Sequence, residues 1–456
     1  MERPEKTPEA AAKARKQDAQ DLSRAQGPET HKPAKPWWHS VGPGLITGCA
    51  DDDPSGIGTY SVTGAQFGYQ LLWLAPFCLP FMIAVQEMCG RVGVVTGRGL
   101  ASAIKGNYPK WMLFGSLLLL VSANTFNIYA DLNVMAASAQ MLFHGSFWFW
   151  LAIWTAAIIL MLVFIPYRHY VRWLKWLCLA LLAYVVVAFM PSAHIDWKQV
   201  GVHALTPNWR NDPAFIMTVV GFLGTTISPY LFFWQASEEV EEEIKEGTAD
   251  APGHRTTSPS VKEMRALRGD TVVGMVASQS VAFFVVVCTA ANLHGKGITD
   301  INTAQDAARA LLPLGKSAYW LFTLGILGTG LLAIPTLAGS VGYAVAETFE
   351  WRYGLYRRFI RAHHFYAVIG LSVLVGYAMN FVKSISPVKA LLYSAVLNGV
   401  FAAPLIVMLL LVCNNEKIFG KHRNGRWSNI FGWATVVFMG TAAGIMIWSM
   451  ATGKGS

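Results

Sequence analysis

Two short polar interruptions within apolar stretches hold the residues best suited to do chemistry. They are residues 49–56 (CADDDPSG) and residues 225–230 (TTISPY). Backbone in lipid must be paired unless it faces protein or a water-filled cavity, so carboxylates, proline and glycine within a membrane-spanning helix indicate a binding site. The carboxylates of the first segment predict that this site binds a cation.

Composition places these interruptions in a membrane protein. Of 456 residues, 54% are hydrophobic and 14% are charged, and the mean hydropathy of +0.38 exceeds what a soluble core needs. The formal net charge is +9, but Lys and Arg cluster between the apolar runs, as in the cytoplasmic loops of membrane proteins. We therefore expect the lipid bilayer as a partner and no nucleic acid.

The cysteines and the N-terminal segment suggest no separate chemistry. The six cysteines fall mostly within apolar runs, without a CxxC pair or zinc-ligand spacing, so we expect them to be packing residues. Residues 1–36 are rich in Glu, Lys, Ala, Gln and Pro and have no apolar signal-peptide core. We expect a disordered cytoplasmic tail there, followed by a transmembrane domain over residues 37–456.

Eleven apolar runs approach the length of about 20 residues that a membrane-spanning helix needs, which predicts an all-α polytopic membrane protein. With the N-terminus inside, the loops richest in Lys and Arg all fall on the cytoplasmic side, as the positive-inside rule requires. We expect the plasma membrane of a bacterial type of cell. The expected helices are 42–63, 68–92, 111–142, 147–166, 172–190, 213–243, 267–292, 315–346, 365–382, 388–413 and 428–450.

The interrupted helices are the first and the sixth of these eleven. This spacing is expected of two five-helix repeats of opposite topology, here 42–190 and 213–413, followed by an extra helix at 428–450. Inverted repeats place a substrate near the bilayer midplane between the interrupted helices and expose it to each side in turn. The pattern therefore predicts a secondary transporter.

Several motifs resemble those of the NRAMP family of metal transporters. The first helix and the loop after it carry residues 42–44 (GPG), 53–56 (DPSG) and 66–73 (QFGYQLLW). The likeness extends from residue 42 to about residue 450, most strongly over the first hundred residues, and implies a fold like that of LeuT. Further matching segments are Gln86, 91–97 (RVGVVTG), 100–101 (LA), Asp131-Leu132 and 336–339 (TLAG).

The departures from the family pattern concern its metal ligands. The family's first-helix aspartate is kept as Asp53, but Gly56 stands where the family has an asparagine ligand. On the sixth helix, Ser228 replaces the family's methionine and Tyr230 replaces a histidine. Thioethers favour softer transition metals, whereas carboxylate, hydroxyl, carbonyl and water suit Mg²⁺ and Mn²⁺. The chain thus resembles the NRAMP-related magnesium transporters, which implies transport of Mg²⁺ and Mn²⁺, the magnesium ion being partly hydrated.

The family's proton-coupling residues are also incomplete. Asp131 remains on the third helix, but Val134 occupies the position of an acidic residue. Neither Val134 nor Tyr230 titrates near neutral pH, so we expect a uniporter driven by the ion gradient and the membrane potential. Asp51, Asp52 or Asp131 provides an alternative route for protons.

The predicted metal site combines side chains and backbone carbonyls from both interruptions. Asp53 has an alternative role as a helix cap, and Ser228 an alternative role in bonding a nearby carbonyl. Gln235 fits either a cavity wall or a helix–helix hydrogen bond. The candidate ligands are Asp53, Gly56, Ser228, Ala50 and Thr225; the candidate vestibule or accessory residues are Asp51, Asp52, Tyr230, Gln235, Glu238, Asp131, Ser394 and Asn398.

Two rival functions remain open. One is a proton-coupled Mn²⁺ and Fe²⁺ importer of the ordinary NRAMP type, and the other is a transporter of small anions that uses the positive ends of the half-helices. Asp53 opposes the second because it would repel an anion. No motif of an enzyme is present in a plausible context, and we expect no cofactor and a monomeric protein.

Overall fold

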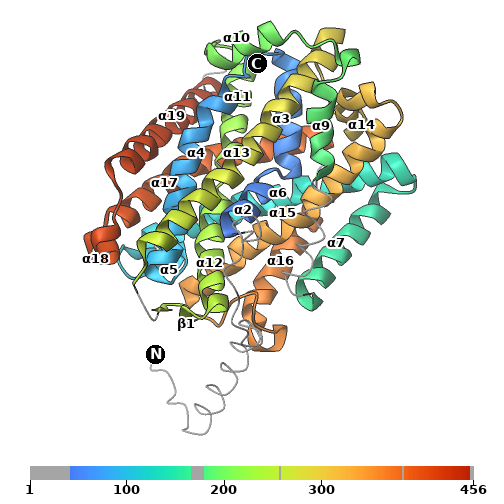
Figure 1. Ribbon diagram of the computed structural model, residues 1–456. Coiled ribbons are helices and arrows are strands. Elements are labelled where there is room, and N and C mark those ends of the chain that lie inside the picture. The colour runs from blue at the N-terminus through green and yellow to red at the C-terminus, as the bar shows by residue number, and fades with distance from the viewer. Residues whose placement is uncertain (1–41, 166–178, 256–257, 383–384, 452–456) are drawn as a thin grey trace.

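The computed structural model describes residues 42–165, 179–255, 258–382 and 385–451. These segments form a helical bundle, with α10 at one end and α5, α18 and the strand β1(Ala249–Ala251) at the other (Figure 1). The helices are α2(Pro43–Asp51), α3(Pro54–Phe67), α4(Leu74–Thr96), α5(Leu100–Lys105), α6(Lys110–Phe143), α7(Phe147–Phe164), α9(Leu182–Ala188), α10(Trp197–Leu205), α11(Pro213–Thr226), α12(Pro229–Glu246), α13(Val261–Asn292), α14(Ala304–Ala308), α15(Ser317–Phe349), α16(His363–Met379), α17(Pro387–Asn414), α18(Glu416–Phe419) and α19(Arg426–Ala451).

The expected eleven spans have counterparts among the described residues. Eight apolar segments are long enough to cross a membrane, α11 and α12 counting as one, and two shorter apolar helices cover Leu179–Ala188 and His363–Met379. The interrupted pair α2 and α3 completes the set. The first part of the expected helix 172–190 lies outside the described residues.

The starts of two expected helices differ most from the structure among the described residues. The helix expected from residue 267 begins six residues earlier, since α13 starts at Val261. The helix expected over 68–92 begins only at Leu74, because Gly68 adopts a φ of +57° and residues 68–73 form turns. A left-handed glycine after α3 ends that helix and redirects the chain. At its other end α4 continues to Thr96.

Both expected interruptions are present, and each has a proline at the start of its second half. α2 ends at Asp51 and α3 begins at Pro54, while α11 ends at Thr226 and α12 begins at Pro229. Proline lacks the amide hydrogen that a continuing helix would use, but it suits the first turn of a new helix. These two sequence positions therefore fix where the backbone leaves helical geometry.

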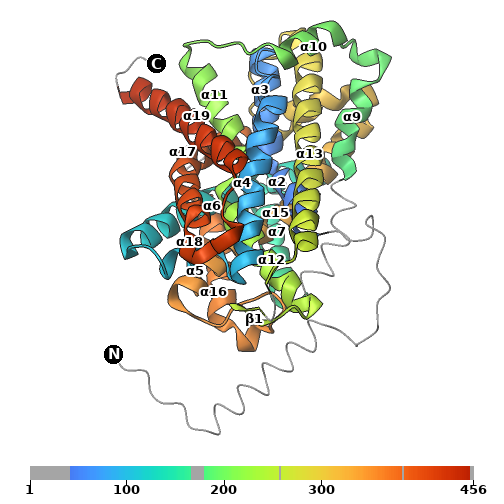
Figure 2. The same cartoon turned by 60° about the vertical axis from the view of Figure 1, so that its left-hand side comes forward.

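Close helix contacts surround the interruptions. α2 and α3 both pack on α13, and α11 packs on α17; Figure 2 shows α3 beside α13. A Cβ atom on Gly274 of α13 would lie 2.2 Å from the Gly44 carbonyl oxygen, and one on Gly224 of α11 would lie 2.0 Å from that of Ala395. Only glycine permits helices to approach this closely.

Some features of the described chain were not expected. A two-stranded antiparallel hairpin, β1(Ala249–Ala251) and β2(His254–Arg255), joins α12 to α13. The described cysteines pack as expected: Cys78, Cys89, Cys288 and Cys413 are buried thiols, and Cys49 is partly buried against the core. Cys178 lies outside the described residues.

Candidate functional site

The two interruptions lie against each other. The Tyr230 hydroxyl donates to the Ala50 carbonyl oxygen over 2.8 Å, which joins the start of α12 to the end of α2. The Tyr60 hydroxyl is 3.3 Å from Thr226 Oγ1, and a Cβ on Gly56 would lie 3.1 Å from Thr225 Oγ1. The fold thus brings residues about 170 positions apart in the chain into one buried site.

Asp53 is at the centre of this site and caps α3. Its Oδ1 accepts hydrogen bonds from the Gly56 amide at 2.7 Å and from the Ser55 hydroxyl at 2.8 Å. Its Oδ2 accepts from Asn127 Nδ2 at 2.8 Å. The side chain is 1% exposed. The capping role is therefore present, and it holds a carboxylate at the break with lone pairs left for a cation.

The third membrane helix, α6, supplies a residue that sequence reasoning missed. Asn127 is fully buried and holds Asp53, as described above, and Asp131 lies one turn further along the same helix, close to Asp53 and the Ser55 backbone. The signal was available in the sequence, since Asn127 and Asp131 are four residues apart and share a helix face.

The second interruption contributes hydroxyl groups. The Ser228 hydroxyl donates to the carbonyl oxygens of Gly224, at 3.0 Å, and Thr225, at 2.8 Å. Ser228 therefore makes the bond to a nearby carbonyl that was one of its two expected roles. Donation of its proton leaves the oxygen lone pairs available. Thr225 Oγ1 is buried and has no hydrogen-bond partner among the described residues.

Asp51 and Asp52 both lie within hydrogen-bond distance of a single hydroxyl group. Ser278 Oγ on α13 lies 2.7 Å from Asp51 Oδ2 and 3.2 Å from Asp52 Oδ1. Neither aspartate takes part in an ion pair between described residues. Asp51 Oδ1 is buried without a hydrogen-bond partner in the described part of the chain.

α17 brings one further amide toward the second interruption. Asn398 is fully buried, and neither its Oδ1 nor its Nδ2 has a partner among the residues that the structure describes. It precedes Gly399, where α17 packs closely on α11: a Cβ added at Gly399 would lie 2.4 Å from the Val220 carbonyl oxygen. Ser394, by contrast, donates its hydroxyl to the Leu391 carbonyl oxygen at 2.8 Å.

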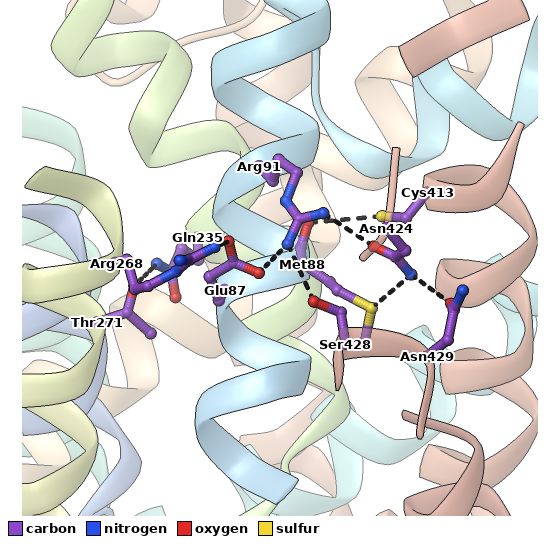
Figure 3. Close-up of polar contacts among 10 residues, drawn as sticks. All are labelled: Glu87, Met88, Arg91, Gln235, Arg268, Thr271, Cys413, Asn424, Ser428 and Asn429. Carbon is purple, nitrogen blue, oxygen red and sulfur yellow. Dashed lines mark hydrogen bonds and ion pairs between the residues drawn. The ribbon is translucent and has the colours of Figure 1, made fainter. Parts of the chain in front are cut away.

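Gln235 and Glu238 lie away from the interruptions. They follow Ser228 on α12 by seven and ten residues, which is about 10 and 15 Å along a helix axis. Gln235 Nε2 donates to Thr271 Oγ1 of α13 at 3.2 Å (Figure 3), so it makes the helix–helix hydrogen bond that was one of its two expected roles. Glu238 is 9% exposed.

The arrangement suits a hard cation that keeps part of its water. The groups shown at the interruptions are carboxylates, carboxamides, hydroxyls and backbone carbonyls, which are oxygen donors. No group of three His, Cys, Asp or Glu side chains within the described ranges is placed to hold a metal ion by itself. Water is the natural source of the remaining ligands, since buried unpartnered oxygens are normally hydrated.

Known proteins are similar to this chain in sequence. Residues 44–449 match the family model described as "Natural resistance-associated macrophage protein-like". Relatives named "Divalent metal cation transporter MntH" include that of Klebsiella pneumoniae (strain 342), 25% identical over 89% of this chain and 93% of the relative. Another, from Deinococcus radiodurans, is 25% identical over 91% of this chain and 90% of its own length.

Solved structures show the same architecture. The Eremococcus coleocola manganese transporter superposes with a TM-score of 0.72 at 20% identity, covering 94% of this chain and 89% of that one. MhsT, solved with L-phenylalanine, gives a TM-score of 0.57 at 11% identity, covering 91% and 100%. These similarities establish the LeuT type of inverted-repeat fold. With a family match over nearly all of its described residues, the chain is an integral membrane protein that belongs to the NRAMP family.

Proposed function

We propose that this protein transports divalent metal cations by alternating access, with Mg²⁺ and Mn²⁺ as substrates. Its NRAMP membership supports the class of substrate. The observation that carries the choice of ion is the second interruption, where a hydroxyl, that of Ser228, bonds to the carbonyls of Gly224 and Thr225. A hydroxyl does not favour soft metals over the far more abundant hard ones.

The proposed binding site is centred on Asp53. Thr225, Ser228 and the backbone near Gly56 complete the direct ligands, and Asn127 holds the carboxylate in place. The Ala50 carbonyl accepts the Tyr230 hydroxyl in this conformation, but a carbonyl oxygen has a second lone pair for an ion or its water. Asp51, Asp52, Asp131 and Asn398 surround this centre and interact with the ion through water.

Transport is proposed to be uncoupled from protons. The interruption that carries Tyr230 has no imidazole, and the Tyr230 hydroxyl is committed to the Ala50 carbonyl. Val134 offers no titratable group on α6. The ion gradient and the membrane potential then drive entry, the potential contributing about 4.6 kcal/mol per divalent ion at 100 mV.

The proposed topology follows the distribution of basic residues. The end of the bundle that carries α5 and the β hairpin contains Arg98, Lys105 and Arg352, and we assign it to the cytoplasm by the positive-inside rule. The N-terminus is then cytoplasmic, and the membrane is the plasma membrane of a bacterial type of cell. Residues 42–190 and 213–413 are proposed as the two inverted repeats of a monomer.

Uptake into proteoliposomes tests this function. Purified protein is given Mg²⁺, Mn²⁺ or Cd²⁺ in parallel while the internal pH is recorded. Flux of Mg²⁺ and Mn²⁺ without acidification is expected. Flux of Mn²⁺ or Cd²⁺ with acidification and without Mg²⁺ would instead identify a proton-coupled importer, and the absence of any cation flux would favour the anion transporter.

Substitution at Ser228 tests the choice of ion. Ser228→Met adds a thioether, so we expect Cd²⁺ uptake to rise and Mg²⁺ uptake to fall relative to the unmodified protein. Ser228→Ala is the control, because it removes the hydroxyl without adding sulfur. If both variants change the ratio of Cd²⁺ to Mg²⁺ uptake equally, the thioether has no part in selectivity at this position.

A further inference from the structure

A polar cavity lies at the end of the bundle occupied by α5 and the β hairpin. Its volume is about 590 Å³, and it is bounded by the segment from α4 to α5, the hairpin turn, and the end of α15 with the loop that follows. None of its lining residues belongs to the two interruptions. Figure 1 shows α5, α12 and β1 together at this end of the molecule.

The lining of this cavity is rich in positive charge. It contains the four basic residues Arg98, Lys105, Arg352 and Arg357. Two carboxylates, Glu347 and Glu350, also line it. Four positive and two negative groups leave a net charge of about +2, which favours an anion over a cation in a partly enclosed space.

Both carboxylates already have partners. Glu350 Oε1 accepts from Lys105 Nζ at 3.0 Å. Glu347 Oε2 accepts from the Ser102 amide at 2.9 Å, and its Oε1 from the Ser237 hydroxyl at 3.4 Å. Lys105 and Glu350 neutralise each other, so Arg98, Arg352 and Arg357 together with the single carboxylate Glu347 leave the same net charge of about +2.

Arg98 is held in place by the hairpin. The Gly253 amide donates to the Gly97 carbonyl oxygen at 2.6 Å. A Cβ on Gly253, which has a φ of +79°, would lie 2.3 Å from Arg98 Nε. The turn thus supports the guanidinium group, and Arg98 makes no ion pair with any residue in the described ranges.

The cavity favours a phosphate-bearing anion over a nucleobase. Arginine offers a planar set of donors that matches phosphate oxygens two at a time. The indole ring of Trp351 is already stacked at 5.2 Å on Phe349 and lies 4.9 Å from the His364 ring. Both neighbours limit access of a base to this ring, so recognition depends on charge.

We propose that this cavity binds a phosphate group, carried either by an anionic lipid or by a soluble phosphate compound. The lipid source is favoured by the exposed apolar surface next to the lining residues: Phe349 lies between Glu347 and Glu350 in the chain, Phe114 packs on it, and the two are 50% and 47% exposed. Basic pockets between helices on the cytoplasmic side are suited to anionic lipid headgroups. A bound phosphate would join the segment of Arg98 and Lys105 to the loop after α15 that carries Arg352 and Arg357.

The test compares two double variants with the same change in charge. Arg98→Gln with Arg352→Gln removes two positive groups from the cavity. Lys110→Gln with Arg358→Gln removes two positive groups that do not line it. Binding is measured without metal ions on the full chain, by calorimetry with pyrophosphate in uncharged nanodiscs and by thermal stability in nanodiscs with and without phosphatidylglycerol.

Each arm identifies one source of phosphate. If pyrophosphate binds and the affinity falls at least about tenfold in the cavity variant only, the ligand is a soluble phosphate compound. If phosphatidylglycerol raises the melting temperature and the cavity variant alone loses this rise, the ligand is a lipid. Equal losses in both variants, or no effect of either probe on the unmodified protein, would overturn the proposal. The outcome does not depend on ion transport.

Discussion

Asp53 combines two roles that usually belong to different residues. It caps the N-terminus of α3, where the chain becomes helical again after the break, and it places a negative charge where the two interrupted helices meet. A cap lost to alanine costs about 1 kcal/mol, whereas loss of the charge removes the main attraction for a cation. The two roles can be separated by the choice of substitution.

We predict that Asp53→Asn abolishes Mg²⁺ uptake while leaving the fold intact. The asparagine oxygen still accepts from the Gly56 amide, and Asn127 can rotate its amide so that its buried, unpartnered Oδ1 accepts from the new amide. Uptake into proteoliposomes and the melting temperature are measured together. Asp53→Ala serves as the comparison, since it removes both cap and charge. Normal uptake by Asp53→Asn would exclude the carboxylate as an essential ligand.

The residues at the site were predictable to different degrees. Asp53 and Ser228 stand out because a carboxylate or a Ser-Pro pair is rare within an apolar helix. Asn127 was missed because a single amide in a long helix often bonds to a neighbouring helix. Its spacing from Asp131 places both on one helix face, but its role as a partner of Asp53 follows from the tertiary contact alone. The bond between Tyr230 and Ala50 depends on the tertiary approach of the two breaks, which no local pattern specifies.

At the scale of elements, the contact between α2 and α13 positions the first half of the interrupted helix. Asp270 Oδ2 on α13 accepts from the Gly44 amide at 2.6 Å and from the Leu45 amide at 3.3 Å. Amides at a helix N-terminus lack partners within the helix, so this carboxylate satisfies them. Gly274, one helical turn further along α13, allows the two backbones to meet.

We predict that Gly274→Ala displaces α2 and exposes Cys49. The new Cβ would lie 2.2 Å from the Gly44 carbonyl oxygen, so one helix must shift. The rate of Cys49 alkylation by N-ethylmaleimide is measured in a Cys178→Ser background, and an increase of several-fold is expected together with reduced uptake. Gly269→Ala is the control, because a Cβ there meets nothing within 4 Å. Equal rates in both variants would show that α2 tolerates the added methyl group.

A buried ion pair joins α4 to three other elements. Glu87 pairs with Arg91 one turn away, and its Oε1 lies 3.3 Å from the Arg268 Nη2 of α13 (Figure 3). Arg91 also donates to Asn424 at 3.1 Å and to Ser428 at 3.3 Å. The network thus connects α4 with α13, with the segment before α19, and with α19 itself.

We predict that Glu87→Gln lowers the free energy of unfolding by about 3 kcal/mol, because it leaves the Arg91 charge buried without its carboxylate. Arg268→Gln is expected to cost less than about 1 kcal/mol, since that side chain is 66% exposed and exposed ion pairs contribute little. Thermal denaturation in detergent compares the two variants. Equal effects would mean that the carboxylate contributes no more than a surface group.

At the scale of the molecule, the sequence predicted the order of the spans and the positions of both breaks. The length of each apolar run sets the spans, and the two prolines set the breaks. Both features depend on short stretches of sequence, because a span must cross the hydrocarbon core and its backbone must be hydrogen-bonded there. The hairpin between α12 and α13 and the basic cavity beside it were not predicted. They assemble from loops distant in sequence, such as those of Arg98 and Gly253, and polar loops lack the periodicity that reveals helices.

The uncoupled mechanism makes a quantitative prediction for the whole molecule. A uniporter for a divalent ion moves two charges per cycle, so an inside-negative potential of about 60 mV supplies about 2.8 kcal/mol and about a hundredfold accumulation at equilibrium. Cotransport of one proton would add a third charge and a dependence on the pH gradient. We expect the accumulation of Mg²⁺ in proteoliposomes, clamped with potassium and valinomycin, to follow the two-charge slope at every pH gradient. A three-charge slope, together with an accumulation that shifts when the pH gradient changes, would instead show coupling to one proton, with Asp51, Asp52 and Asp131 as the candidate carriers.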